Sequence, residues 1–195
     1  MNVSEPTSQF ADYSGRLQAL LGSADWDGVA QLAKELRDCW SSGRKVFICG
    51  NGGSAGNAIH LANDFLYGIS KTLGSGLRVS ALTANSSVLT CLANDEGYEL
   101  IFSMQLAVQA DRDDVLLVLS GSGNSPNIVK ALEQANIMGM KSYAILGFFG
   151  GKAKALANVP IHFAINDMQI SEDMQLVVGH MIMQWLFRNP PTKRP

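Results

Sequence analysis

A glycine-rich turn between an apolar segment and a helical pattern constrains this chain more than any other feature. Residues 46–49 (Val-Phe-Ile-Cys) have the length and composition of a buried strand, and residues 50–56 read Gly-Asn-Gly-Gly-Ser-Ala-Gly. Apolar residues then recur at helical spacing, at Ala58, Leu61, Ala62 and Phe65. In α/β folds this order places the unpaired N–H groups of a helix start beside a flexible turn, where they bind anions.

The turn also supplies side-chain donors, although its spacing matches neither common nucleotide-binding motif. We expect Ser54 to cap the helix, and Asn51, Gly52 and Gly53 to bind an anion with it. The glycine spacing differs from the GxGxxG dinucleotide pattern, and no GK[ST] follows as in a Walker loop. The residues alone therefore predict an anion-binding loop without naming its ligand.

The same arrangement occurs a second time further along the chain. Residues 114–120 form an apolar strand run, and residues 121–125 read Gly-Ser-Gly-Asn-Ser. Ser125 followed by Pro126 is typical of the N-cap and first position of a helix. This turn contains no basic residue, so its hydroxyl and backbone N–H groups suit a phosphate monoester better than a long polyanion.

Three segments together resemble the sugar isomerase (SIS) domain family, and most closely its phosphoheptose isomerases. They are Cys-Gly-Asn-Gly-Gly-Ser at 49–54, Cys-Leu-Ala-Asn-Asp at 91–95 and Ser-Gly-Ser-Gly-Asn-Ser at 120–125. Three motifs in this order are far more specific than one glycine loop. Phosphoheptose isomerases interconvert sedoheptulose 7-phosphate and glycero-manno-heptose 7-phosphate through an enediol. The resemblance therefore implies an aldose–ketose isomerase that acts on a small sugar phosphate.

Strand runs that alternate with helical patterns predict an α/β three-layer sandwich: a parallel five-stranded sheet, doubly wound and flavodoxin-like, as in SIS domains. Both glycine–serine turns fall at the carboxyl ends of strands, where such sheets bind ligands. Two helices precede the sheet, the second capped by Ser23, and a long helix ends it. We expect a single SIS domain over 1–195, comprising a helical pair (1–44), an α/β core (45–188) and a disordered tail (189–195).

Composition excludes several classes of function. The chain has 195 residues, of which 47% are hydrophobic, and a net charge of -2, which gives no electrostatic reason to expect nucleic acid or acidic membranes as partners. Three cysteines in apolar contexts, Cys39, Cys49 and Cys91, predict buried free thiols in a reducing compartment. The N-terminal segment lacks the pattern of a secretory signal, and no apolar run approaches membrane-spanning length. We therefore expect a soluble cytoplasmic protein.

His60 and Asp64 are the first candidates for catalysis. They stand four residues apart on the helix that follows the first turn, so they share one face and can hold a metal or move protons, although a surface pair has the same spacing. The resemblance assigns His60 to a zinc-ligand histidine, and Asp64 to a glutamate that is both ligand and catalytic base. Aspartate is one methylene shorter, and a misplacement of ~1 Å can cost about a hundredfold in rate.

His180 lies beside the apolar stripe of the last helix, where a histidine is ordinarily a packing residue. The matching family histidine is a zinc ligand and general acid/base, and the family's glutamine ligand eight residues earlier is here Glu172. Eight residues span about 12 Å of helix, so spacing does not single out Glu172, and Asp173 and Gln175 compete with it. The resemblance implies zinc, and the acidic replacements leave its occupancy open. Its ligands would be His60, Asp64, Glu172 and His180.

The resemblance also assigns separate catalytic and binding roles to these residues. Asp64 would move a proton between C1 and C2, while His180 acts on the oxygens. Asn94 and Asp95, which alone predict a turn, match a pair that binds substrate hydroxyls. His162, inside a predicted strand, is expected to be structural. The phosphate would be held by Asn51, Gly52, Gly53, Ser54, Ser120, Gly121, Ser122 and Ser125, with Gly121 replacing a threonine common in the family.

Other functions stay open. A non-catalytic SIS protein could sense a sugar phosphate or serve as an adaptor for a replication initiator, and the change from Glu-Glu to Asn63-Asp64 keeps these alternatives open. Retention of His60 and His180 favours an enzyme, whose substrate could also be another phosphosugar. Similar SIS isomerases use their leading helices to build a homotetramer, so the resemblance implies the same assembly here.

Overall fold

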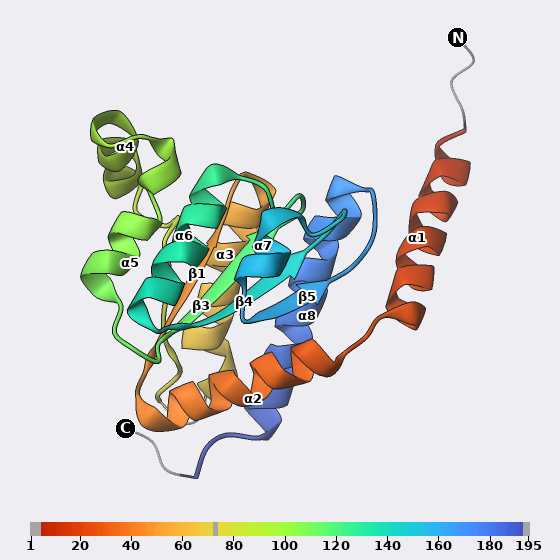
Figure 1. The fold of residues 1–195 in the computed structure, drawn as a ribbon. Helices are drawn as coiled ribbons and strands as arrows, with labels where there is room; N and C mark the ends of the chain where they lie inside the picture. The colour runs from red at the N-terminus through yellow and green to blue at the C-terminus, as the bar shows by residue number, and fades with distance from the viewer. Residues whose placement is uncertain (1–4, 72–73, 193–195) are drawn as a thin grey trace.

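The computed structural model describes residues 5–71 and 74–192, which form a parallel five-stranded sheet with helices on both faces (Figure 1). The strand order is β2-β1-β3-β4-β5, and every neighbouring pair is parallel. This confirms the predicted α/β three-layer architecture. The strands are β1 (Lys45–Gly50), β2 (Arg78–Ala81), β3 (Val115–Ser120), β4 (Lys141–Leu146) and β5 (Val159–His162).

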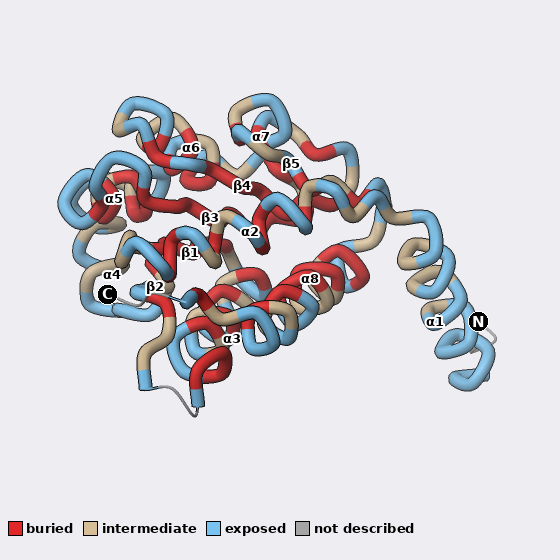
Figure 2. The backbone as a smooth tube through the Cα atoms, turned by 90° about the horizontal axis from the view of Figure 1, so that it is seen from below, coloured by how far each residue is buried: buried red, intermediate tan, exposed pale blue. Residues whose placement is uncertain are grey.

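Alternate side chains of the central strands enter two separate cores. Val46 and Ile48 pack with α2, α3 and α8, whereas Phe47 and Cys49 pack with α5, α6 and α7. Figure 2 shows α3 and α8 together on one side of the sheet, with α6 and α7 on the other. The helices are α1 (Pro6–Ser23), α2 (Asp27–Ser42), α3 (Gly53–Leu66), α4 (Ser86–Asp95), α5 (Ser103–Gln109), α6 (Pro126–Met138), α7 (Gly151–Leu156) and α8 (Met168–Arg188), with two 3-10 turns, η1 (Gly68–Ser70) and η2 (Tyr98–Leu100).

The order of the strands fixes where a ligand can bind. From β1 the chain passes to β2 on one side, and it then returns to place β3 on the other side of β1. The direction of winding therefore reverses between β1 and β3, and in open α/β sheets ligands bind in the crevice that this reversal opens at the carboxyl ends. The two glycine–serine turns follow β1 and β3, so both lie at this point.

Helices α3 and α8 run side by side in the same direction. They approach closely because glycines lie where they meet. Gly53 lies against Glu172, Leu61 against Gly179, and Gly68 of η1, just after α3, against Met183, so residue numbers rise together along both segments. A Cβ atom on Gly179 would overlap the buried side chain of Leu61. This close approach sets the distance between the side chains that flank the contact.

Helix α1 projects from the body of the molecule in both views (Figures 1 and 2), although one apolar side of it packs against the core through Tyr13, Leu17, Leu20 and Leu21. None of the described residues of α1 is buried. Two polar bonds connect it to the first turns of α8: Arg16 pairs with Asp167 at 2.6 Å, and the Tyr13 hydroxyl donates to Asp173 at 2.5 Å. Among the helices that the described residues form, none is long and apolar enough to cross a membrane.

Some local predictions are wrong. Ser23 is the last residue of α1 and donates its hydroxyl to the Ala19 carbonyl instead of capping α2. Cys39 and Cys49 are buried as expected, and burial raises the pKa of the Cys39 thiol to about 12, but Cys91 is exposed on α4. The helix that carries Cys91 buries none of its described residues, so its apolar side chains did not indicate a core position.

The predicted disordered tail lies partly outside the described residues, which end at Thr192. Within them, the Asn189 carbonyl accepts a hydrogen bond from Arg37 at 2.9 Å, and Pro191 is buried. This part of the tail therefore contacts the body of the protein.

We predict that Gly179→Ala lowers the free energy of unfolding by about 1–3 kcal/mol, because the added methyl group overpacks the contact between α3 and α8. Gly15→Ala is the control: its Cβ meets nothing within 4 Å on exposed α1, so it should leave stability unchanged or raise it by up to about 1 kcal/mol. Urea titrations at one protein concentration measure both. Equal effects would show that α3 and α8 are not tightly packed.

Candidate active site

The two glycine–serine turns form one hollow of about 280 Å³ at the carboxyl ends of β1 and β3. Every loop residue that the sequence predicts for phosphate lines this hollow, so the structure brings the two segments together. Met168 and Glu172 of α8 complete its wall. The predicted loop residues are Asn51, Gly52, Gly53 and Ser54 from the first turn and Ser120, Gly121, Ser122 and Ser125 from the second.

A reciprocal pair of side-chain amides holds the two turns to each other. Asn51 Nδ2 donates to Asn127 Oδ1, and Asn127 Nδ2 donates to Asn51 Oδ1, both at 2.8 Å. The Tyr98 hydroxyl donates to the same Asn51 oxygen at 3.1 Å. The Asn51 oxygen is therefore occupied by protein donors, and only the remaining N–H of this side chain is available to a ligand.

Asn127 was not among the residues predicted from the sequence. It is 1% exposed in the first turn of α6, on the same face as buried Ala131 and Ala135. A buried polar group needs hydrogen-bond partners, and Asn51 supplies both of them. A polar residue on an otherwise apolar helix stripe was the signal that could have revealed it.

Three of the four serines that line the hollow accept hydrogen bonds from the protein, which leaves their own protons free to be donated. Ser120 Oγ accepts from the Gly123 N–H at 3.0 Å, and Ser122 Oγ accepts from the Asn124 N–H at 3.3 Å. Ser54 Oγ accepts from Gln175 Nε2 at 2.9 Å. Hydroxyl groups held in this way suit an anion that mainly accepts hydrogen bonds.

Ser54 does not have its predicted position. The N-cap of α3 is Gly52, whose φ of 56° lies in a region that glycine enters without strain, and Ser54 lies two residues inside the helix. Ser125, in contrast, occupies the N-cap of α6 with Pro126 at the first position, as expected.

The replacement of the family threonine by Gly121 has a steric explanation. A Cβ atom on Gly121 would lie 2.6 Å from Met168 Sδ and 3.5 Å from Phe148 Cε2. Met168 thus fills the space that a side chain at position 121 would need. The hollow loses one hydroxyl donor there and gains an apolar wall.

Three side chains form a second cluster, on α3 and α8. His60 and Asp64 come from α3 and His180 from α8, and one ligand atom of each lies within 4.8 Å of the others. The two Nε2 atoms are 2.9 Å apart, and Asp64 Oδ2 lies 3.5 Å from that of His60 and 3.7 Å from that of His180. Gly179 and Leu61 adjoin the histidines, so the close helix contact brings the rings together.

This cluster has the donor set of a catalytic metal centre. Two imidazole nitrogens and one carboxylate oxygen are ligands that zinc prefers, and three protein ligands leave a coordination position for a substrate. Both histidine side chains are about half exposed (49% and 47%), whereas Asp64 is 17% exposed. The residues present therefore fit a zinc ion that a substrate can reach.

Glu172 is not part of the His60–Asp64–His180 cluster. It is in the second turn of α8, where its carboxylate covers Gly53, and it faces the hollow between the turns. His180 is eight residues further on, about 12 Å along the helix. The two competing residues have other partners: Asp173 accepts from Tyr13, and Gln175 bonds Ser54.

Asn94 and Asp95 do not line the hollow of their own chain. They are the last two residues of α4, where Asn94 Nδ2 donates to Asp95 Oδ1 at 2.7 Å. This bond, together with one from Cys91 Sγ, lowers the pKa of the Asp95 carboxyl. His162 bonds Lys154 and the Phe148 carbonyl, in keeping with the structural role expected for it.

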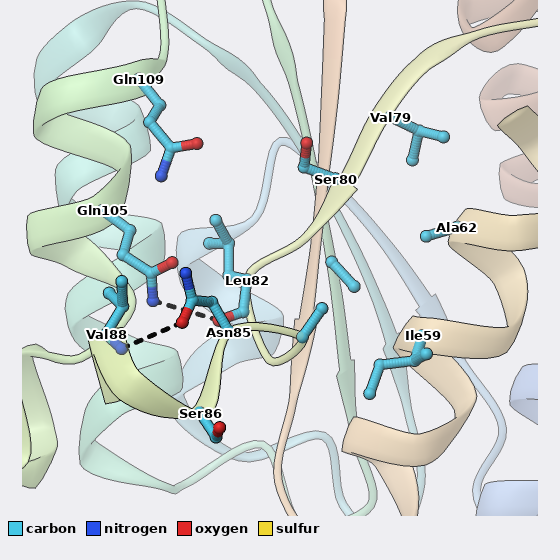
Figure 3. A pocket seen from close by; sticks show the side chains of 12 residues that line it. Ile59, Ala62, Val79, Ser80, Leu82, Asn85, Ser86, Val88, Gln105 and Gln109 are labelled. Atoms are coloured by element: carbon cyan, nitrogen blue, oxygen red, sulfur yellow. Dashed lines mark hydrogen bonds between the residues drawn. The ribbon is translucent and has the colours of Figure 1, made fainter. Parts of the chain in front are cut away.

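A larger hollow of about 580 Å³ lies between α3, β2 and the segment from α4 to α5 (Figure 3). Its polar groups serve the fold: Gln105 donates to the Leu82 carbonyl at 3.1 Å, and Asn85 accepts from the Val88 N–H at 3.2 Å. Among the described residues that line it, none is a predicted site residue. Size alone does not locate the site.

This chain is similar to known proteins over most of its length. The model of the SIS domain family matches residues 9–147. A phosphoheptose isomerase of Akkermansia muciniphila is 38% identical over 160 residues, covering 82% of this chain and 84% of that protein. One of Nitratidesulfovibrio vulgaris is 32% identical over 100% of this chain and 95% of that protein. The solved structure of a phosphoheptose isomerase from Francisella tularensis matches with a TM-score of 0.86 and 26% identity, over 97% of this chain and 100% of the other.

We predict that Asn127→Leu lowers the free energy of unfolding by about 1–3 kcal/mol, because it leaves the Asn51 amide without its partner. The double variant Asn51→Leu/Asn127→Leu should lose less than the sum of the two single variants, since neither amide is then left unpaired. Denaturant titrations measure all three, with Asn166→Leu in the exposed segment before α8 as control. Strictly additive losses would contradict a stabilising amide pair.

Proposed function

The chain belongs to the SIS domain family, among the phosphoheptose isomerases, and we propose that it converts sedoheptulose 7-phosphate into D-glycero-D-manno-heptose 7-phosphate in the cytoplasm. The observation that carries this proposal is that α3 and α8 hold the His60–Asp64–His180 cluster and also border the hollow formed by the two serine-bearing turns. One feature suits a phosphate and the other suits the reacting end of a sugar.

The separation of the two features suits an extended sugar phosphate. His60 follows Gly53 by seven residues, about 10 Å along α3. A phosphate bound at the start of α3 therefore leaves the sugar chain to follow α3 and α8 toward the cluster. A free phosphate would fill only the first part of this path, so the geometry favours a substrate several carbons long.

The reaction moves one proton between carbon atoms and one between oxygen atoms. Asp64 removes the proton from C1 of the ketose to form the enediol and returns it to C2, which yields the aldose. His180, whose Nε2 faces the Asp64 carboxylate, transfers the proton between the oxygens of C1 and C2. His60, Asp64 and His180 would hold zinc, which would supply Lewis-acid polarisation of these oxygens. Because the ion would occupy His180 Nε2, this nitrogen transfers protons only in the metal-free site.

The side chains of the hollow hold the substrate during these steps. Ser54, Ser120 and Ser122 donate their hydroxyl protons to the phosphate, and the N–H groups at the start of α3 add further donors. Fixing the non-reacting end aligns C1 and C2 with the base. Glu172, at the edge of the hollow, is placed to accept a hydrogen bond from a sugar hydroxyl.

Assembly into a homotetramer is part of the proposal. Large apolar side chains are exposed around the cluster, and α1 presents a helix of which the described residues are not buried. Exposed apolar side chains are a feature of protein interfaces where they gather into a patch. Asn94 and Asp95 would reach the sugar hydroxyls in the assembled protein. The exposed large apolar side chains described on α1, α3, α8 and directly after α3 are Phe10, Ile59, Leu66, Tyr67, Met168, Met181 and Phe187.

We predict that Asp64→Asn lowers kcat by about 10²–10⁴-fold, because an amide cannot take the C1 proton. Binding of the sugar phosphate should change little, since the phosphate is held elsewhere. NMR spectra that follow sedoheptulose 7-phosphate measure turnover, with the same change at an exposed position of α2 as control (Asp38→Asn). Unimpaired turnover by Asp64→Asn would refute the base assignment. A wild-type protein without turnover, with and without zinc, would point instead to a sugar-phosphate sensor.

We further predict that His60→Ala and His180→Ala each abolish tight zinc binding, because either change leaves two ligands. His162, the third histidine of the chain, provides the matched control: His162→Ala should bind zinc like the wild type. Glu172→Gln should also retain zinc, since Glu172 lies beside Gly53. Calorimetric titration of the metal-free protein tests all four. Zinc loss in Glu172→Gln would contradict the proposed ligand set.

A further inference from the structure

A line of side-chain hydrogen bonds connects Asn57 through Gln175 to Ser54, between α3 and α8. Asn57 Nδ2 donates to Gln175 Oε1 at 2.9 Å, and Gln175 Nε2 donates to Ser54 Oγ at 2.9 Å. Gln175 is 1% exposed and Ser54 is 3% exposed. The two amides touch neither the second turn nor the zinc cluster through these bonds, and the mechanism above does not use them.

The direction of this line is set by a backbone group. Asn57 Nδ2 also donates to the Glu172 carbonyl at 3.0 Å. A carbonyl can only accept, so Asn57 has to present its nitrogen on this side, and its second N–H points at Gln175. Gln175 must then turn its oxygen toward Asn57 and its nitrogen toward Ser54.

We propose that Asn57 and Gln175 are positioning residues that make Ser54 a hydrogen-bond donor to the substrate phosphate. Because Ser54 Oγ accepts from Gln175, its own proton is directed into the hollow. Backbone N–H groups donate to Ser120 and Ser122, whereas a side chain donates to Ser54. Of these three serines, Ser54 is therefore the one whose role as donor or acceptor toward a ligand depends on side chains. The inference rests on the proposed function, in that a phosphate monoester occupies this hollow.

The variant Asn57→Asp should reverse the direction of donation along this line of hydrogen bonds. A carboxylate at position 57 accepts from Gln175 Nε2, so the Gln175 amide turns over and its oxygen faces Ser54. Ser54 then donates to Gln175 and presents a lone pair to the phosphate. The Kd for inorganic phosphate and for sedoheptulose 7-phosphate should rise about 10- to 100-fold, as expected when a hydrogen bond to a charged group is lost. KM should rise in step with Kd while kcat stays similar.

Two further variants separate the reversal from other effects. Gln175→Glu makes the same reversal at the other position, because its carboxylate accepts from both Asn57 and Ser54. Gln169→Glu adds the same charge to an exposed position in the first turn of α8, and it should change phosphate binding little. Thermal unfolding of each variant shows whether it is folded before its affinity is compared.

A double-mutant cycle measured by calorimetry decides the matter. Ser54→Ala should weaken phosphate binding in the wild-type background and have little effect, or improve binding, in the Asn57→Asp and Gln175→Glu backgrounds. The coupling should disappear in Gln175→Leu, where Asn57→Asp should have little effect because the connection is broken. A merely structural role of Asn57 would not make the cost of Ser54→Ala depend on the amides.

An equal cost of Ser54→Ala in the wild-type and in the reversed backgrounds would overturn the inference and leave the proposed function intact. A wild-type protein that binds neither inorganic phosphate nor sedoheptulose 7-phosphate would overturn the proposed function, and this inference with it. The two failures are therefore distinguishable in one set of titrations.

Discussion

The reciprocal amide bonds between Asn51 and Asn127 connect two turns that are far apart in the sequence and adjacent in the sheet. Each turn alone is a strand end followed by a helix start, with donors but no defined partner. The amide pair holds them at one distance, so that serines from both face the same hollow. Because a buried amide without a partner costs stability, the fold itself maintains the geometry of the site.

The pair of helices α3 and α8 carries both halves of the proposed chemistry. Their first turns border the hollow, and about two turns further on they bring His60, Asp64 and His180 together. Gly179 permits this, because a larger residue there would push the helices apart where the histidines meet. The packing of two helices thus determines both the distance between phosphate and reacting carbons and the spacing of the ligands.

Local patterns predicted most of the fold and the loop residues of the site. Strand, glycine turn and helix follow one another within about twenty residues, so propensity and spacing identify them directly. Asn127 was not predicted as a site residue, and Gln175 was considered only as a competing metal ligand, because the partners of both come from another part of the chain. Glu172 was assigned to the metal by resemblance, but its position on α8 places it beside Gly53. Tertiary contacts decided each of these cases.

A crystal structure with sedoheptulose 7-phosphate tests the central claim most directly. The phosphate should lie within hydrogen-bond distance of both Ser54 and Ser122, and the C1–C2 end should lie against Asp64 and His180. A phosphate that contacts only one of the two turns, or a sugar chain that leads away from α3 and α8, would contradict the account.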